Sequence, residues 1–189
     1  MPGKKRISRR TVIAGAFVPV TALTAAAKAT LTAPQRKTLE AFADRLMPHD
    51  EYGPSASEAG AVEYIDRSLS DYLAPEKPAI VKGLAALDAF AGRPFAELSP
   101  VEQDQVIAAM EKNTATGFEP DSRTFFLRIR QLTLEGMFGD PFYGGNRAYA
   151  GWDLIRYPGP RLAVGPDEQK IGVEIKPFRS SAHGSGHGH

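Results

Sequence analysis

Apolar side chains recur at three- and four-residue intervals along most of this 189-residue chain, which is the spacing of one helix face. Two of these periodic segments begin with a Ser or Thr, a proline nearby and a Gln or Glu three residues on. This is the sequence form of a helix N-terminal capping box, and it occurs at Thr32–Gln35 and Ser99–Glu102. No segment alternates well enough to indicate a strand. The sequence therefore predicts an all-α fold.

Five helices account for the periodic segments, and together they predict a bundle. The first follows Thr32 and stops at Pro48, the second starts near Ser57, and the fifth is capped by Asp121 or Ser122. Proline residues separate the second helix from the third, and the second capping box starts the fourth. The residues expected to face the core are Leu39, Phe42, Ala43, Leu46, Val62, Ile65, Leu69, Tyr72, Leu73, Ile80, Val81, Leu84, Leu87, Phe90, Val106, Ile107, Met110, Phe125, Phe126, Ile129, Leu132, Thr133 and Met137.

The character of the chain changes near Gly136, where a glycine- and aromatic-rich loop region begins. Residues 136–159 contain six glycines among Phe, Tyr and Trp side chains, so they cannot form a long helix. Asp140 and Asn146 are expected to cap local turns. From the residues alone, two roles are equally open for this segment: it completes the chain's own core, or it forms an interface, where aromatic residues are favoured.

The N-terminus has the pattern of an export signal. Five basic residues precede an apolar run from Val12 to Ala27, which ends in small residues of the A-x-A type. The run is short and diluted for a membrane span, so cleavage is favoured over a permanent anchor. Ser8, Arg9 and Arg10 directly before the apolar run form a twin-arginine address. A general secretory signal and an uncleaved anchor are the alternatives.

Removing residues 1–27 changes what the charge implies. The remaining 18 Lys and Arg against 22 Asp and Glu give a net charge of −4, which argues for neither nucleic acid nor anionic lipid as a partner. The chain contains no cysteine, so it cannot hold an iron–sulfur cluster or attach a c-type haem through thiols. We expect one helical domain over residues 28–179, followed by a disordered His-, Gly- and Ser-rich tail over residues 180–189.

No residue set in the chain has the pattern of a catalytic site. His49 lies beside two carboxylates but has no nucleophile motif and no spaced second histidine. Glu63 and Arg67 stand at i,i+4 and are interpreted as an ion pair on a solvated helix face. The glycines match no nucleotide-binding motif. We therefore expect no catalytic, cofactor-binding or metal-binding residue; a metal-dependent enzyme using His49, or a free-standing binding module, is the alternative.

The glycine- and aromatic-rich segment resembles the signature of the gluconate 2-dehydrogenase subunit 3 family. The resemblance extends from about residue 35 to 160, with Arg156 standing where the family pattern has glycine. The residues that carry it most clearly are Phe138-Gly139-Asp140-Pro141-Phe142-Tyr143-Gly144-Gly145-Asn146, Gly151-Trp152 and Tyr157-Pro158-Gly159.

This resemblance implies a non-catalytic small, or gamma, subunit of a membrane-associated dehydrogenase complex in the periplasm. A large flavoprotein of the glucose–methanol–choline type would hold FAD, and a multihaem cytochrome c is a common third subunit. The small subunit would assist folding of the flavoprotein and carry both to the twin-arginine translocase. The substrate would be chosen by the flavoprotein. The residues expected to bind the partner are Phe138, Asp140, Pro141, Phe142, Tyr143, Gly144, Gly145, Asn146, Trp152, Tyr157 and Pro158.

Overall fold

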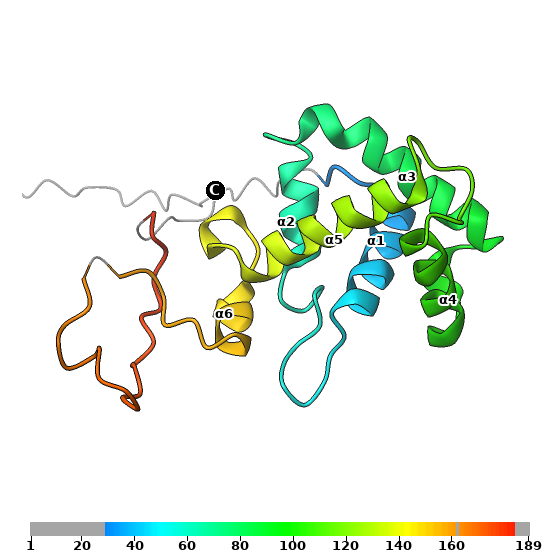
Figure 1. Cartoon of the computed structure of the whole chain (residues 1–189). Coiled ribbons are helices and arrows are strands. Elements are labelled where there is room, and N and C mark those ends of the chain that lie inside the picture. Colours follow the sequence, from blue (N-terminus) through cyan, green and yellow to red (C-terminus); the bar gives the residue numbers. More distant parts are fainter. Residues whose placement is uncertain (1–28, 162, 184–189) are drawn as a thin grey trace, which may run out of the picture.

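The computed structural model describes residues 29–161 and 163–183, and within them it contains α-helices, short 3₁₀ turns and no strand. The prediction of an all-α fold is confirmed. Six α-helices form the domain, with the longest, α5, crossing its centre (Figure 1). Their bounds are α1 (Ala33–Leu46), α2 (Ala61–Ser68), α3 (Lys77–Ala91), α4 (Pro100–Glu111), α5 (Ser122–Phe138) and α6 (Ala150–Leu154).

The helix starts are those that the caps predict. The Thr32 amide donates to Gln35 Oε1 at 2.9 Å before α1. The Ser99 amide donates to Glu102 Oε2 at 2.7 Å before α4, and the amide of Glu102 donates back to Ser99 Oγ at 3.4 Å. Each cap satisfies amide groups that have no partner within the helix, so the start of each helix is fixed locally.

The core lies where α5 packs on α2, α1 and α4. Close approach of α5 and α2 depends on Gly136, because a Cβ there would come within 2.8 Å of the Ala61 Cα atom. Most of the predicted core stripe is buried, including all six residues predicted on α5. Tyr72 and Phe90 are exceptions: both side chains are exposed. Tyr72 lies beyond the end of α2, where the chain turns away from the helical register.

The second helix is shorter than expected. It begins at Ala61 and not near Ser57, because the preceding residues form turns that end at Gly60, whose φ of +87° breaks the helix. It ends at Ser68, before the η1 turn (Ala74–Glu76). The fourth η turn, η4 (Arg147–Tyr149), leads into α6, which the sequence did not predict because a five-residue helix among glycines gives no periodic signal.

The two ends of the domain differ. α3 and α4 lie at one end of α5, while α6 and the C-terminal segment, drawn in yellow to red, lie at the other (Figure 1). The C-terminal segment over residues 163–183 has turns but no helix. Of the helices in the described ranges, none combines the length and hydropathy of a membrane span. The predicted export signal, with Ser8, Arg9 and Arg10, lies outside the described residues, as do residues 184–189 of the predicted tail.

Candidate interaction site

The loop region that follows α5 folds back onto the start of α2. The Asn146 amide donates to the carbonyl of Gly136 at 2.7 Å, and the Arg147 amide donates to the carbonyl of Ala59 at 2.7 Å. Gly145 lies so close to this contact that a Cβ would come within 2.0 Å of the Gly136 carbonyl oxygen. Only glycine permits this backbone approach, which explains one glycine of the signature.

Asn146 joins the two halves of the loop from inside. Its side chain is fully buried. Its Nδ2 donates to the carbonyl of Gly139 at 2.8 Å, and its Oδ1 accepts from the amide of Gly151 at 2.9 Å. The role of Asn146 is thus broader than the turn cap expected from sequence, because both of its polar groups satisfy buried backbone atoms.

Trp152, on α6, belongs to the core of its own chain. Its side chain is 4% exposed, and Nε1 donates to the carbonyl of Phe138 at 2.9 Å. The rings of Tyr149 and Tyr157 pack against it at centroid distances of 5.3 Å and 4.9 Å. For Trp152 the structure therefore shows self-packing, the first of the two roles left open for this segment.

Other members of the predicted partner-binding set lie on the surface. Phe142 and Tyr143 are 43% and 45% exposed, and their rings meet edge to face at 5.3 Å. Asp140 holds them in place, because its Oδ1 accepts from the Phe142 amide at 2.9 Å and so caps the η3 turn (Pro141–Tyr143). We call the exposed side chains of Phe142, Tyr143, Ile155 and Tyr157 the aromatic surface.

A shallow groove of about 380 Å³ lies beside this surface. Of the predicted set, Phe138, Pro141, Gly144 and Pro158 are half-buried, and Gly145 is buried. The residues predicted to bind the partner therefore divide into buried or half-buried residues, which pack within the loop, and exposed residues, which are free to contact a partner. The groove is lined by Phe138, Asp140, Trp152, Ile155, Tyr157, Pro160 and Ala182.

Left-handed backbone is concentrated in this loop. Ala148, Tyr149 and Arg156 have φ values of +53°, +62° and +54°, which side chains with a Cβ rarely adopt. Such conformations persist only where the surrounding contacts determine them. The φ of Arg156 is one that glycine takes without strain, which accounts for the glycine of the family pattern at this position; nothing in the structure explains the arginine.

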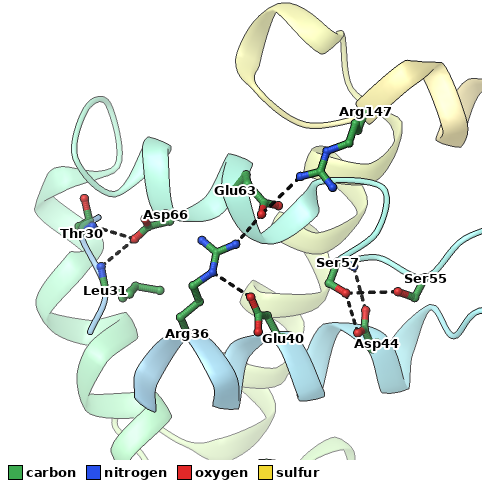
Figure 2. A network of polar contacts seen from close by, with 10 residues as sticks. All are labelled: Thr30, Leu31, Arg36, Glu40, Asp44, Ser55, Ser57, Glu63, Asp66 and Arg147. Atoms are coloured by element: carbon green, nitrogen blue, oxygen red, sulfur yellow. Dashed lines mark hydrogen bonds and ion pairs between the residues drawn. The ribbon is translucent and has the colours of Figure 1, made fainter. Parts of the chain in front are cut away.

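A polar network ties the loop to α1 and α2 (Figure 2). Glu63 Oε1 accepts from Arg36 at 2.5 Å and lies 3.4 Å from Arg147 NH2. Arg36 also pairs with Glu40 at 2.8 Å. The prediction that Glu63 pairs with Arg67 is therefore wrong. The Glu63 carboxylate lies instead between the guanidinium groups of Arg36 on α1 and Arg147 in the loop.

Two more carboxylates in Figure 2 bind backbone that sequence spacing did not connect to them. The Asp66 carboxylate, nearly buried, accepts from the amides of Thr30 at 3.0 Å and Leu31 at 2.7 Å. Asp44 accepts from the Ser57 amide at 2.8 Å and from its hydroxyl at 2.7 Å. These contacts span up to 36 residues, so no local pattern could have indicated them.

His49 is part of an exposed pair and not of a larger constellation. Its Nδ1 lies 2.8 Å from Glu58 Oε2. The hydrogen bond with Glu58 raises the pKa of His49, and the same bond lowers the pKa of the Glu58 carboxyl. Within residues 29–161 and 163–183, no three His, Asp or Glu side chains gather as metal ligands would.

Comparison with known proteins gives one match. A protein-family model described as gluconate 2-dehydrogenase subunit 3 matches residues 33–159. No curated protein and no solved structure gives a significant match. The matched range begins with α1 and ends directly after the loop region, so it contains both the helical core and the aromatic surface.

Proposed function

Because the chain belongs to the gluconate 2-dehydrogenase subunit 3 family, we propose that it is the non-catalytic small subunit of an FAD-dependent sugar, polyol or alcohol dehydrogenase complex. In this proposal the chain assists folding of a large flavoprotein of the glucose–methanol–choline type. It carries the export signal for both chains, and the complex works in the periplasm at the inner membrane. A multihaem cytochrome c is the third subunit that would take the electrons.

The family match over residues 33–159 is the observation that carries this proposal. It supports an accessory subunit of a dehydrogenase complex directly. The finer statement draws on the sequence: Arg9 and Arg10 precede a short apolar run, and no cysteine is present to hold a redox centre. Folded export suits a protein that travels together with a cofactor-loaded partner.

The aromatic surface supports the choice of docking site. Phe142 and Tyr143, on the loop between α5 and α6, expose large apolar area. This loop lies at the end of α5 opposite α3 and α4 (Figure 1). Aromatic side chains of this kind dominate the energetics of protein interfaces. The buried side chains of Asn146 and Trp152 hold the loop in the shape that presents them.

Co-expression with a flavoprotein of the glucose–methanol–choline type from the same genome tests the proposal. We expect the two chains to purify together, with all flavin bound to the large one and none to this chain alone. A His49→Ala variant should leave the activity of the complex unchanged. Flavin bound to the isolated chain, or sugar oxidation by it, would contradict the proposal, as would stoichiometric metal bound through His49.

A further inference from the structure

The C-terminal segment of the chain lies against Phe142 and Tyr143 of the aromatic surface and against Asp140, Tyr149 and Asp153. In Figure 1 its last described residues, in red, return toward the yellow loop after an excursion away from the domain. The contacts begin at Pro158, whose carbonyl accepts from the Phe178 amide at 2.7 Å. They continue to His183, so residues 178–183, which contain no helix and end in a turn, follow the face formed by the loop and α6.

Asp140 and two aromatic rings hold the far end of this segment. Asp140 Oδ2 accepts from the Ala182 amide at 2.8 Å. The His183 ring packs on that of Phe142 at 4.9 Å, and its Nε2 lies 3.2 Å from the Tyr143 hydroxyl. Burial opposes ionisation of Asp140, but hydrogen bonds from Ser181 and from backbone amides lower the pKa of its carboxyl overall.

Arg179 makes the contacts at the centre of the segment. Its guanidinium lies 5.7 Å from the centroid of the Tyr149 ring and pairs with the carboxylate of Asp153. A guanidinium over an aromatic face is attracted by the ring quadrupole. The face therefore binds a cation at its centre, a planar ring at one end and backbone groups at both ends.

Residues 178–183, which we call the cover, and the face beneath them differ in whether the family model matches them. Every surface residue named here lies within the range that the family model matches, whereas residues 178–183 lie beyond it. The face thus lies inside the family-matched range, and the segment that lies on it is outside that range.

We propose that the face formed by Asp140, Phe142, Tyr143, Tyr149 and Asp153 binds an extended peptide segment of the partner subunit, and that residues 178–183 occupy this face until the partner displaces them. This inference rests on the proposed function. The segment expected from the partner presents a free backbone N–H to Asp140. It places a basic side chain over Tyr149 and a planar ring on Phe142 about four residues later, as Arg179 and His183 do here.

Competition follows from this arrangement. For a ligand that binds only the uncovered form, the apparent affinity equals the intrinsic affinity multiplied by the fraction of molecules that are uncovered. Weakening the cover therefore strengthens binding of any segment with the same chemistry, without changing the surface itself.

A peptide with the sequence of residues 175–183, labelled with a fluorophore, tests the surface in trans. We expect fluorescence anisotropy to show about fivefold tighter binding to the full-length Arg179→Ala/His183→Ala variant than to the wild-type chain. Lys170→Ala removes a charge from the same C-terminal region, away from the surface, and should leave binding at the wild-type value. Equal binding to the double variant and the wild type, or no binding to either, would overturn the proposal.

The flavoprotein partner separates this inference from the function on which it rests. The double variant should bind the flavoprotein about fivefold more tightly than the wild type. Equal, measurable affinity of both chains would contradict the cover and leave the proposed function intact. No affinity of either chain would contradict the proposed function, and the peptide experiment would still decide whether the face binds an extended segment.

Discussion

At the scale of single residues, the loop after α5 is held by side chains that satisfy backbone groups. Asn146 bridges Gly139 and Gly151, and Trp152 donates to Phe138, so both ends of the loop are tied to its middle. Buried polar atoms of the backbone need such partners, because a lost hydrogen bond there leaves a desolvated group. The stability of the loop therefore depends on a few specific residues.

Replacing Asn146 by Ala tests this dependence. We expect the free energy of unfolding to fall by roughly 3 kcal/mol, because two buried backbone groups lose their partner and Ala tolerates the φ of +44° less well than Asn. Asn113→Ala is the comparison: Asn113 also has positive φ, at +59°, and its Oδ1 accepts from the Ser122 hydroxyl and the Arg123 amide, but it is exposed, and a loss of about 1 kcal/mol is expected. Equal losses in urea unfolding would contradict the special contribution of the buried Asn146 side chain.

Arg156 allows the strain in the loop to be measured. With φ at +54° and an exposed side chain, Arg156→Gly should be more stable than Arg156→Ala by about 1 kcal/mol, since only glycine takes this conformation freely. Both variants lose the same side-chain charge, so their difference reports the backbone. Thermal unfolding of the pair is the measurement, and an Ala variant as stable as the Gly variant would refute the assignment of strain.

At the scale of elements, α2 is the point where distant segments meet. Glu63 joins α2 to α1 and to the loop, and Asp66 binds the residues that enter the domain before α1 (Figure 2). Gly136 brings α5 close to the same helix. One short helix therefore holds both the residues just before α1 and the loop after α5.

Removing the Asp66 carboxylate should release the start of the domain. Asp66→Ala is expected to lower stability by about 2 kcal/mol, because the Thr30 and Leu31 amides lose their acceptor. It should also speed hydrogen exchange at Leu31. Asp104→Ala, which removes an exposed partner of Arg45, should cost less than about 1 kcal/mol. Unchanged exchange at Leu31 in the Asp66 variant would contradict this role.

The elements themselves could largely be predicted from sequence, while their junctions could not. Helix starts at Thr32, Ser99 and Asp121 follow from local capping chemistry, and the stripe on α5 follows from helical spacing. Glu63 was assigned the wrong partner because i,i+4 spacing says nothing about a guanidinium 27 residues away. The aromatic segment was identified, but its division into buried Trp152 and exposed Phe142 depends on how the loop folds back.

At the scale of the whole molecule, the helices pack around a core on one side, and the loop region at the other end exposes aromatic side chains. The helical core and the loop together lie in the family-matched range, and the C-terminal segment beyond it covers part of the presented surface. In an accessory subunit, side chains that bind the partner must stay exposed in the free chain, so they are different from the side chains that form its core.

Paired substitutions distinguish these two kinds of residue. Phe142→Ala should weaken binding of the flavoprotein by about 2 kcal/mol while hardly changing the melting temperature, because the side chain is exposed in the free chain. Trp152→Ala should instead destabilise the isolated chain by about 3 kcal/mol. Phe90→Ala, an exposed phenylalanine on α3 at the opposite end, is the control and should change neither strongly. Affinity and melting temperature falling together in the Phe142 variant would argue for self-packing.

Export of the flavoprotein is the property that most directly tests the account. In cells producing both chains, the Arg9→Lys/Arg10→Lys variant should leave this chain and the flavoprotein in the cytoplasm, because in the proposed function one twin-arginine signal exports both. Arg6→Lys makes the same substitution outside the pair and should leave export unchanged. Immunoblots of periplasmic and cytoplasmic fractions give the result. Retention of both chains is predicted, and a flavoprotein that still reached the periplasm would contradict the account.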